Sequence, residues 1–201
     1  MPLIAADLVR VAAAVSLVAG TVSYGWLGFA LFSLVLGGVM LPRAIGTPQW
    51  LDVLYGGVLL FGAWAAQLDW YVTVPWLDLV VHAVATGLIG VLCWQTLVRV
   101  GALPGPALDD DGPAPATVAC PRLGAVVVTS ALAAALAGLW EIGEWVGHAW
   151  IDPRIQVGYD DTVGDLAAGV LGAVIAGLLV ARTLPRPGRA DAATPVREER
   201  R

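Results

Sequence analysis

Six predominantly apolar stretches, separated by more polar connections, limit what this chain can fold into more than any other feature. They cover approximately residues 8–22, 25–41, 51–67, 76–97, 123–150 and 162–182. In a helix, about 20 apolar residues cross a hydrocarbon core of about 30 Å. The composition agrees, because 58% of the residues are hydrophobic and only 13% are charged, which is not the balance of a soluble domain. We predict an all-α polytopic membrane protein, a bundle of about six transmembrane helices.

The domain organisation follows from these stretches. Residues 1–182 are predicted to form one six-span transmembrane domain, within which residues 98–122 form a loop rich in Pro, Gly and Asp. We interpret the run of aspartates in this loop as a solvated charge run. Residues 183–201 are basic and rich in Pro and Ala, so we predict a disordered tail.

The arginines predict the orientation, since the chain has no lysine. Every arginine except Arg154 lies on the side of the bundle that six spans give to both termini. Cytoplasmic segments carry the excess of positive charge in membrane proteins, so both termini, the loop and the tail are predicted to be cytoplasmic. Cys93 and Cys120 lie toward this reducing side, and we expect no disulfide. We expect membrane lipids as the surroundings and no nucleic-acid partner.

Three of the predicted spans carry acidic or imidazole side chains within apolar sequence. The members of each pair are three or four residues apart: Asp78 and His82, Glu141 and Glu144, and Asp161 and Asp165. This spacing puts both members of a pair on one face of a helix. With a rise of about 1.5 Å per residue, the three pairs reach a similar depth on the non-cytoplasmic side. The sequence therefore predicts one shared site in the outer leaflet.

The predicted site needs shared protons or a cation. A charged side chain costs about 2.5 to 3.5 kcal/mol at mid-membrane, and several carboxylates in a small volume repel one another. Carboxylates with one imidazole suit Mg²⁺, Mn²⁺, Fe²⁺ or Zn²⁺, and the sequence does not choose among these. We predict a divalent metal ion with all six residues as ligands. Glu141 and Glu144 are also the predicted catalytic groups, and His148 and Arg154 are the predicted substrate-binding residues.

Simpler interpretations stay open for several residues. Asp161 could be the N-cap of the last predicted helix, and His82 could only hydrogen bond to a carboxylate. The glutamates could pair with Arg154 and fix helix packing. Tryptophans around the site are interpreted as interfacial belt residues. Arg10 and Asp52 are interpreted as side chains that reach to water from the ends of their spans.

Three motifs occur in order along the second half of the chain: WLDLVVHA at residues 76–83, WEIGEW at 140–145 and YDDTVGDLAAGVLGA at 159–173. Together they resemble the YjdF-like family of uncharacterised bacterial inner-membrane proteins. The order of acidic motifs is also similar, more loosely, to the VanZ-like membrane proteins, although WEIGEW has a second glutamate where a glutamine-containing pattern is expected. The closer resemblance implies a multi-pass protein of the bacterial cytoplasmic (inner) membrane and leaves its biochemical role open.

Three functions are compatible with these features. We favour a metal-dependent membrane enzyme, or a relative that only binds, acting on a lipid or lipid-linked substrate that enters from the outer leaflet. A small proton- or cation-coupled transporter or channel is the alternative, but the inner halves of the spans hold few polar residues for a continuous path. A structural scaffold held together by its ion pairs is the third.

Overall fold

The computed structural model describes residues 5–103 and 120–184, and within these ranges it contains helices and no strands. The predicted all-α fold is confirmed. Most of the 98–122 loop and nearly all of the 183–201 tail lie outside the described residues, and the predictions made for them stay predictions. The helices, in chain order, are α1 (Ala5–Gly38), α2 (Leu41–Ala44), α3 (Gln49–Gln67), α4 (Trp70–Thr73), α5 (Pro75–Arg99), α6 (Pro121–Trp150) and α7 (Tyr159–Thr183).

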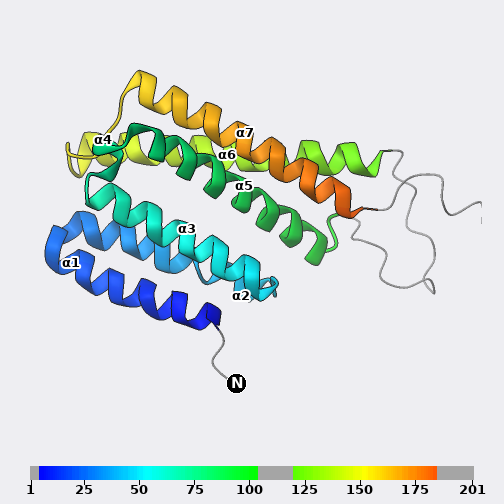
Figure 1. Cartoon of the computed structure of the whole chain (residues 1–201), viewed down its shortest axis with the longest axis horizontal. Coiled ribbons are helices and arrows are strands. Elements are labelled where there is room, and N and C mark those ends of the chain that lie inside the picture. Colours follow the sequence, from blue (N-terminus) through cyan, green and yellow to red (C-terminus); the bar gives the residue numbers. More distant parts are fainter. Residues whose placement is uncertain (1–4, 104–119, 185–201) are drawn as a thin grey trace, which may run out of the picture.

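The first helix is a hairpin rather than one straight rod. Gly25 lies inside it at φ 64° and ψ −137°, a positive-φ conformation that glycine adopts readily because it has no Cβ. The chain reverses there, and residues 5–24 and 26–38 form two neighbouring antiparallel arms (Figure 1). The arms are in backbone contact, because a Cβ on Gly28 would lie 2.1 Å from the Gly20 carbonyl oxygen. They correspond to the first two predicted spans.

The helices alternate in direction, so their termini gather at two ends of the bundle (Figure 1). The α2 end also holds the start of α1, the end of α5, the start of α6 and the end of α7. The α4 end holds the Gly25 turn and the connection between α6 and α7. Four helical stretches are long and apolar enough to cross a membrane, the first of which contains both arms of α1: Ala5–Ala44, Pro75–Arg99, Pro121–Trp150 and Tyr159–Thr183.

Helices α5, α6 and α7 form a close three-helix unit in which small residues occupy the contact positions. A Cβ on Gly172 would lie 1.8 Å from the backbone oxygen of Ala83 on α5, and one on Gly177 would lie 2.9 Å from that of Val126 on α6. Small residues allow helices to approach this closely in a membrane. The small residues of α7 are buried at these contacts, at Gly169, Gly172, Ala173, Ala176 and Gly177.

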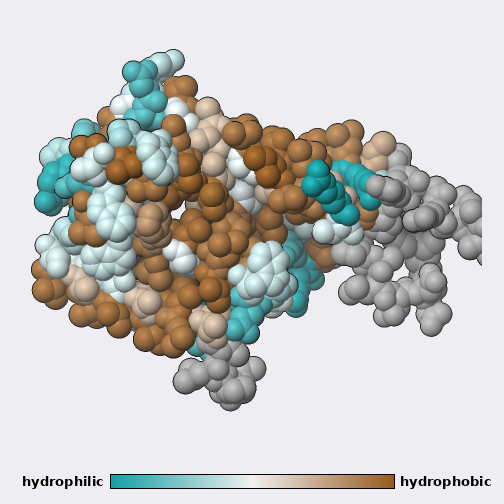
Figure 2. Space-filling model, in the orientation of Figure 1, coloured by the Kyte–Doolittle hydropathy of each residue, from teal (hydrophilic) through white to brown (hydrophobic). Residues whose placement is uncertain are grey.

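Apolar side chains cover the outside of the helices. Figure 2 shows mainly hydrophobic residues over the middle of the bundle, with hydrophilic residues gathered toward its ends. Large side chains such as Val22, Leu34 and Leu139 are largely exposed. A continuous apolar exterior of this kind is a surface for lipid, and the fold is that of a polytopic helical membrane bundle.

Candidate metal centre

Asp78 and His82 lie one turn apart on α5, and Asp165 faces them from α7. His82 Nε2 is 3.4 Å from Asp78 Oδ1 and 3.9 Å from Asp165 Oδ2. One ligand atom from each of the three residues lies within 4.8 Å of the others. Asp165 is buried and the other two side chains are half-buried. We call these three residues the Asp/His cluster.

Glu141 approaches the same histidine from α6. Its Oε1 is 3.7 Å from His82 Nδ1, the ring nitrogen opposite the one that faces the aspartates. Glu141 is only 7% exposed, and its buried Oε1 has no hydrogen-bond partner. A buried carboxylate oxygen without a partner carries a desolvation penalty of about 1–3 kcal/mol or more. A positive charge or a proton at this site would therefore stabilise the fold.

Small residues close the site one helical turn further into the bundle. Thr86, Ala137 and Gly169 each lie four positions from a site residue on the same helix. A Cβ on Gly169 would be 3.0 Å from Thr86 Oγ1 and 3.6 Å from Ala137 Cβ. The three helices therefore meet directly beneath the site, on the side of the α2 end. We call this contact the floor of the site, because it holds the three helices at a fixed separation.

Glu144 and Asp161 lie at the edge of the site and outside the Asp/His cluster. Glu144 is half-buried and close enough to the other carboxylates to interact with them electrostatically. Asp161 is in the first turn of α7, whose N-cap is Gly158. The interpretation of Asp161 as the N-cap is wrong, because the helix begins earlier than the apolar pattern indicates.

Tyr71, on α4, belongs to the surroundings of the site, and the sequence analysis missed it. Its hydroxyl donates to the Gly62 carbonyl oxygen at 3.1 Å. Burial, followed by the charges of nearby carboxylates with Asp78 foremost, raises the pKa of this phenol. It therefore stays protonated beside the acidic side chains. A tyrosine in a short connection has no helical spacing to mark it, and its closeness in sequence to the WLDLVVHA motif is the one available signal.

The predicted substrate-binding residues lie in and before the connection between α6 and α7. His148 and Arg154, with Asp161, line a surface recess of about 350 Å³. His148 Nδ1 is 2.6 Å from the Ile155 carbonyl oxygen. Because a carbonyl oxygen only accepts hydrogen bonds, Nδ1 carries the proton and the other ring nitrogen is the basic one. The structure thus places both residues beside the site, at its exposed margin.

Arg154 pairs with a loop carboxylate. Its Nη2 donates to Asp152 Oδ2 at 2.7 Å, and its Nε contacts both carboxylate oxygens. Hydrogen bonds from the Arg154 side chain, and then from its backbone N–H, lower the pKa of Asp152 to about 2. The interpretation that Arg154 pairs with Glu141 or Glu144 is wrong, because an aspartate two residues away along the chain provides a nearer partner.

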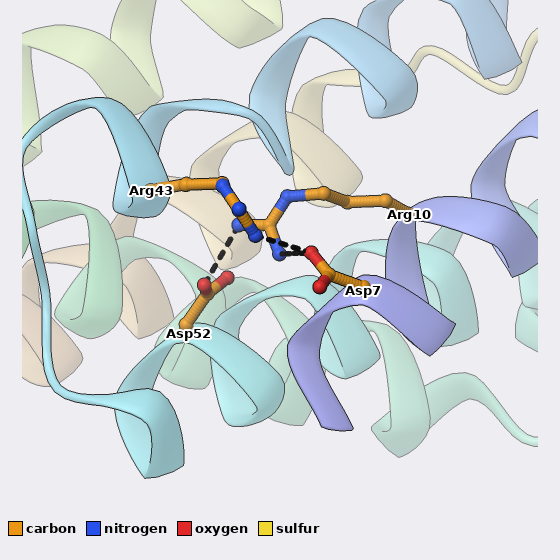
Figure 3. Close-up of polar contacts among 4 residues, drawn as sticks. All are labelled: Asp7, Arg10, Arg43 and Asp52. Carbon is orange, nitrogen blue, oxygen red and sulfur yellow. Dashed lines mark hydrogen bonds and ion pairs between the residues drawn. The ribbon is translucent and has the colours of Figure 1, made fainter. Parts of the chain in front are cut away.

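A second group of charged side chains lies at the α2 end. Figure 3 shows Asp7, Arg10, Arg43 and Asp52 pointing toward one another from α1, α2 and α3. Arg10 Nη2 donates to Asp52 Oδ2 at 2.7 Å, and both residues are buried. Arg43 forms an ion pair with Asp7. We call these residues the paired-charge cluster. The interpretation that Arg10 and Asp52 reach to water is wrong, because each neutralises the other inside the bundle.

The donor set at the α4 end suits a divalent metal ion. Two carboxylates and one imidazole nitrogen are ligands for Mn²⁺, Fe²⁺ or Zn²⁺. Zinc-type ligand distances of about 2.0–2.2 Å place the ligand atoms about 4 Å apart or less, so the observed spread within 4.8 Å needs only a small contraction. Three protein ligands leave coordination positions open to water or to a substrate oxygen.

The family model described as "Predicted membrane protein (DUF2238)" matches residues 2–186 of the chain. YjdF is a member of this family, so the resemblance identified from the three motifs is confirmed. Comparison with curated proteins and with solved structures gives no match.

Proposed function

This chain belongs to the DUF2238 family of predicted membrane proteins, and we propose that it binds a divalent metal ion through Asp78, His82 and Asp165. With this ion it acts on a lipid or lipid-linked substrate. The observation that carries the proposal is the convergence of three ligand atoms from α5 and α7 within 4.8 Å. Beside them lies the buried Glu141 oxygen, which has no hydrogen-bond partner.

The charge balance of the site supports a bound cation. Several carboxylates approach one another in a largely apolar bundle, and Arg154, the arginine of this end, is paired with Asp152. Charged groups inside a membrane are paired, hydrated or bound to ions. If Glu141 accepts from His82 Nδ1–H, then Nε2 and the two aspartates present three electron-pair donors to one point. A divalent cation there satisfies all three.

The proposed reaction is hydrolysis of an ester or phosphoester. An ion held by Asp78, His82 and Asp165 would supply a positive charge to the substrate oxygen that gains negative charge. Glu144, at the edge of the site, takes a proton from the attacking water as its oxygen bonds to the ester carbon or the phosphorus. The bond to the leaving group then breaks, and the alkoxide takes the proton back from Glu144 to become the alcohol. His148 and Arg154, at the exposed margin, contact the polar headgroup.

In this proposal the site lies in the outer leaflet of a bacterial cytoplasmic membrane, with both termini in the cytoplasm. The distribution of arginines supports it, since Arg154 is the arginine at the α4 end among those in residues 5–103 and 120–184. The native Cys120 at the α2 end and a cysteine introduced at Gln156 at the α4 end report on the two sides, because both positions are exposed. In intact cells that express a variant without Cys93, a membrane-impermeant thiol reagent should label the cysteine at position 156 and should not label Cys120. The opposite labelling would place the site in the inner leaflet.

Metal analysis of the purified chain tests the proposed ligands. We expect about one divalent ion per folded chain, and its loss in Asp165→Asn and His82→Ala. Asp160→Asn is the matched control, because Asp160 is an exposed acid of the same helix end outside the Asp/His cluster. Binding of the metal by Asp165→Asn and by the wild type to the same extent would exclude these ligands, and an absence of metal from the wild type would exclude the proposal.

A transporter or channel is less well supported. An ion path through α5, α6 and α7 would have to pass the floor of the site, where backbone and small side chains are in contact. Proton or cation flux into vesicles that contain the wild type, and its loss in Glu144→Gln, would favour transport over a one-sided pocket. If the protein is only a scaffold, replacing the site carboxylates by neutral residues should impair folding and cause no separate functional defect. A folded variant that loses function would exclude the scaffold.

A further inference from the structure

The His82 ring lies between two groups of carboxylates on opposite sides. Its Nε2 faces Asp78 and Asp165 at 3.4 and 3.9 Å, and its Nδ1 faces Glu141 Oε1 at 3.7 Å. The aspartates come from α5 and α7, whereas Glu141 comes from α6. A metal ion held by the Asp/His cluster would therefore lie on the Nε2 side of the ring, and Glu141 lies on the other side.

This arrangement separates the role of Glu141 from that of the aspartates. In metal sites the histidine ring nitrogen that does not bind the metal commonly donates its N–H to a carboxylate, which fixes the tautomer and the ring orientation. Glu141 Oε1 is buried and has no hydrogen-bond partner. His82 Nδ1, at 3.7 Å, is its ion-pair contact in the site, and a small approach of the two groups would form this hydrogen bond. The floor of the site, where α5, α6 and α7 are in contact, lies one helical turn below this pair.

We propose that Glu141 is a positioning residue that acts through His82 and is neither a ligand nor a catalytic residue, contrary to its predicted roles. The inference rests on the proposed metal site. It assigns three protein ligands to the ion and leaves its other positions to external oxygen ligands, such as water and a phosphate or ester oxygen. It also implies that the contact between α5 and α6 fixes the tautomer of His82, in which Nδ1 carries the proton and Nε2 binds the metal.

Histidine NMR provides a direct test, because the chain contains only two histidines. Full-length protein with ¹⁵N-labelled histidine, loaded with Zn²⁺, should show His82 with a protonated Nδ1 and a metal-shifted Nε2. His148 is an internal reference, because its Nδ1 donates to the Ile155 carbonyl oxygen. Glu141→Leu should change the His82 ring signals and leave those of His148 in place.

Metal titration separates a positioning role from ligation. Loss of a carboxylate beside a ligating histidine typically weakens metal binding about 10- to 100-fold. We therefore expect a Zn²⁺ affinity loss of this size in Glu141→Leu and a smaller loss in the isosteric Glu141→Gln, which keeps a hydrogen-bond acceptor. Both should retain a wild-type Co²⁺ absorption spectrum at saturation, since the ligands are unchanged. Glu144→Gln is the control for loss of one negative charge on the same helix and should leave the His82 signals unchanged.

The outcomes that would overturn the inference differ from those that would overturn the metal site. A changed Co²⁺ spectrum in Glu141→Gln, or a loss of affinity as complete as in Asp165→Asn, would make Glu141 a ligand. If both variants keep the wild-type Zn²⁺ affinity and the wild-type His82 signals, Glu141 does not act through His82. Glu141→Gln keeps the test open if Glu141→Leu does not fold. Failure of the wild type to bind Zn²⁺ or Co²⁺ would instead exclude the proposed function itself.

Discussion

At the α2 end of the bundle two arginines lie against two aspartates, whereas at the α4 end the carboxylates gather around a single histidine. In the paired-charge cluster each charge has an opposite charge within the chain, as Arg10 has in Asp52 at 2.7 Å (Figure 3). In the Asp/His cluster the separations are 3.4 to 3.9 Å, and Glu141 has an oxygen with no hydrogen-bond partner.

The difference shows how a structural contact can be told from a candidate site: a buried charge in a structural contact has an opposite charge within the chain. A buried charge is tolerated when its partner is built into the fold, and the paired-charge cluster meets that condition by itself. Other arginines of the α2 end also form hydrogen bonds within the chain. Arg99 donates to the Gly46 carbonyl oxygen at 3.0 Å, and Arg122 donates to the Leu184 carbonyl oxygen at 2.7 Å. The Asp/His cluster has no arginine partner among the ion pairs of the described residues, which is the condition for binding an external cation.

The largest expected effect comes from breaking the pair between Arg10 and Asp52. Arg10→Met should lower the free energy of unfolding by about 3–5 kcal/mol, because it leaves Asp52 buried without its counter-charge. Arg10→Met combined with Asp52→Leu should recover most of that loss. Thermal unfolding of detergent-purified protein measures both. A single variant as stable as the wild type would contradict the structural role of this cluster.

The acidic end should respond in the opposite direction. In the presence of a chelator, Asp165→Asn should be at least as stable as the wild type, because it removes one repelling charge. Mn²⁺ at about 100 times its dissociation constant should raise the free energy of unfolding of the wild type by about 2.7 kcal/mol. The same addition should leave Asp165→Asn unchanged. Equal stabilisation of both proteins would place the binding elsewhere.

A smaller effect is expected from the packing that holds the acidic end together. Gly172→Ala should cost about 1–3 kcal/mol, because its Cβ would lie 1.8 Å from the Ala83 carbonyl oxygen. The shift of α7 relative to α5 should also weaken metal binding. Gly143→Ala is the matched control, since no atom lies within 4 Å of its added Cβ. A similar loss of stability in both variants would mean that it comes from replacing glycine by alanine in a helix and not from close packing.

The smallest effect concerns the exposed pair of Asp152 and Arg154. The pKa of Asp152 is lowered to about 2 from a usual value of 3.8, so the contribution of the pair is present above pH 3.8 and is lost as the pH falls through about 2. The stability difference between Asp152→Asn and the wild type should therefore be constant from pH 7 to pH 5. Unfolding curves at several pH values within this range check it, and a difference that changes with pH there would assign another partner to Asp152.

Much of the architecture was predictable from the sequence. The length and hydropathy of the apolar stretches indicate helices that cross a membrane, and the spacing of Asp78 and His82 puts them on one face of a helix. Small residues at four-residue spacing in residues 168–177 also indicate close packing of α7 against its neighbours. These properties are local, because helical periodicity depends only on residues a few positions apart.

The partner of each charged side chain was not predictable. Arg10 and Asp52 are 42 positions apart and belong to different helices, so no spacing in the chain relates them. Likewise, the sequence places Glu141 and Asp165 at similar depths in the bundle, but only the packing of three helices puts Glu141 against Nδ1 of His82 and Asp165 against Nε2.

The sequence by itself thus determined that the chain folds into apolar membrane helices and which of the helices carry acids. Only the tertiary structure decided which acids are neutralised within the chain and which gather around a histidine. The physical reason is that hydropathy and periodicity act along one helix, whereas Coulomb interactions and ligand geometry depend on distances of a few Å between helices. The contact of Gly172 with the α5 backbone and those of Gly169 with the Thr86 and Ala137 side chains set those distances.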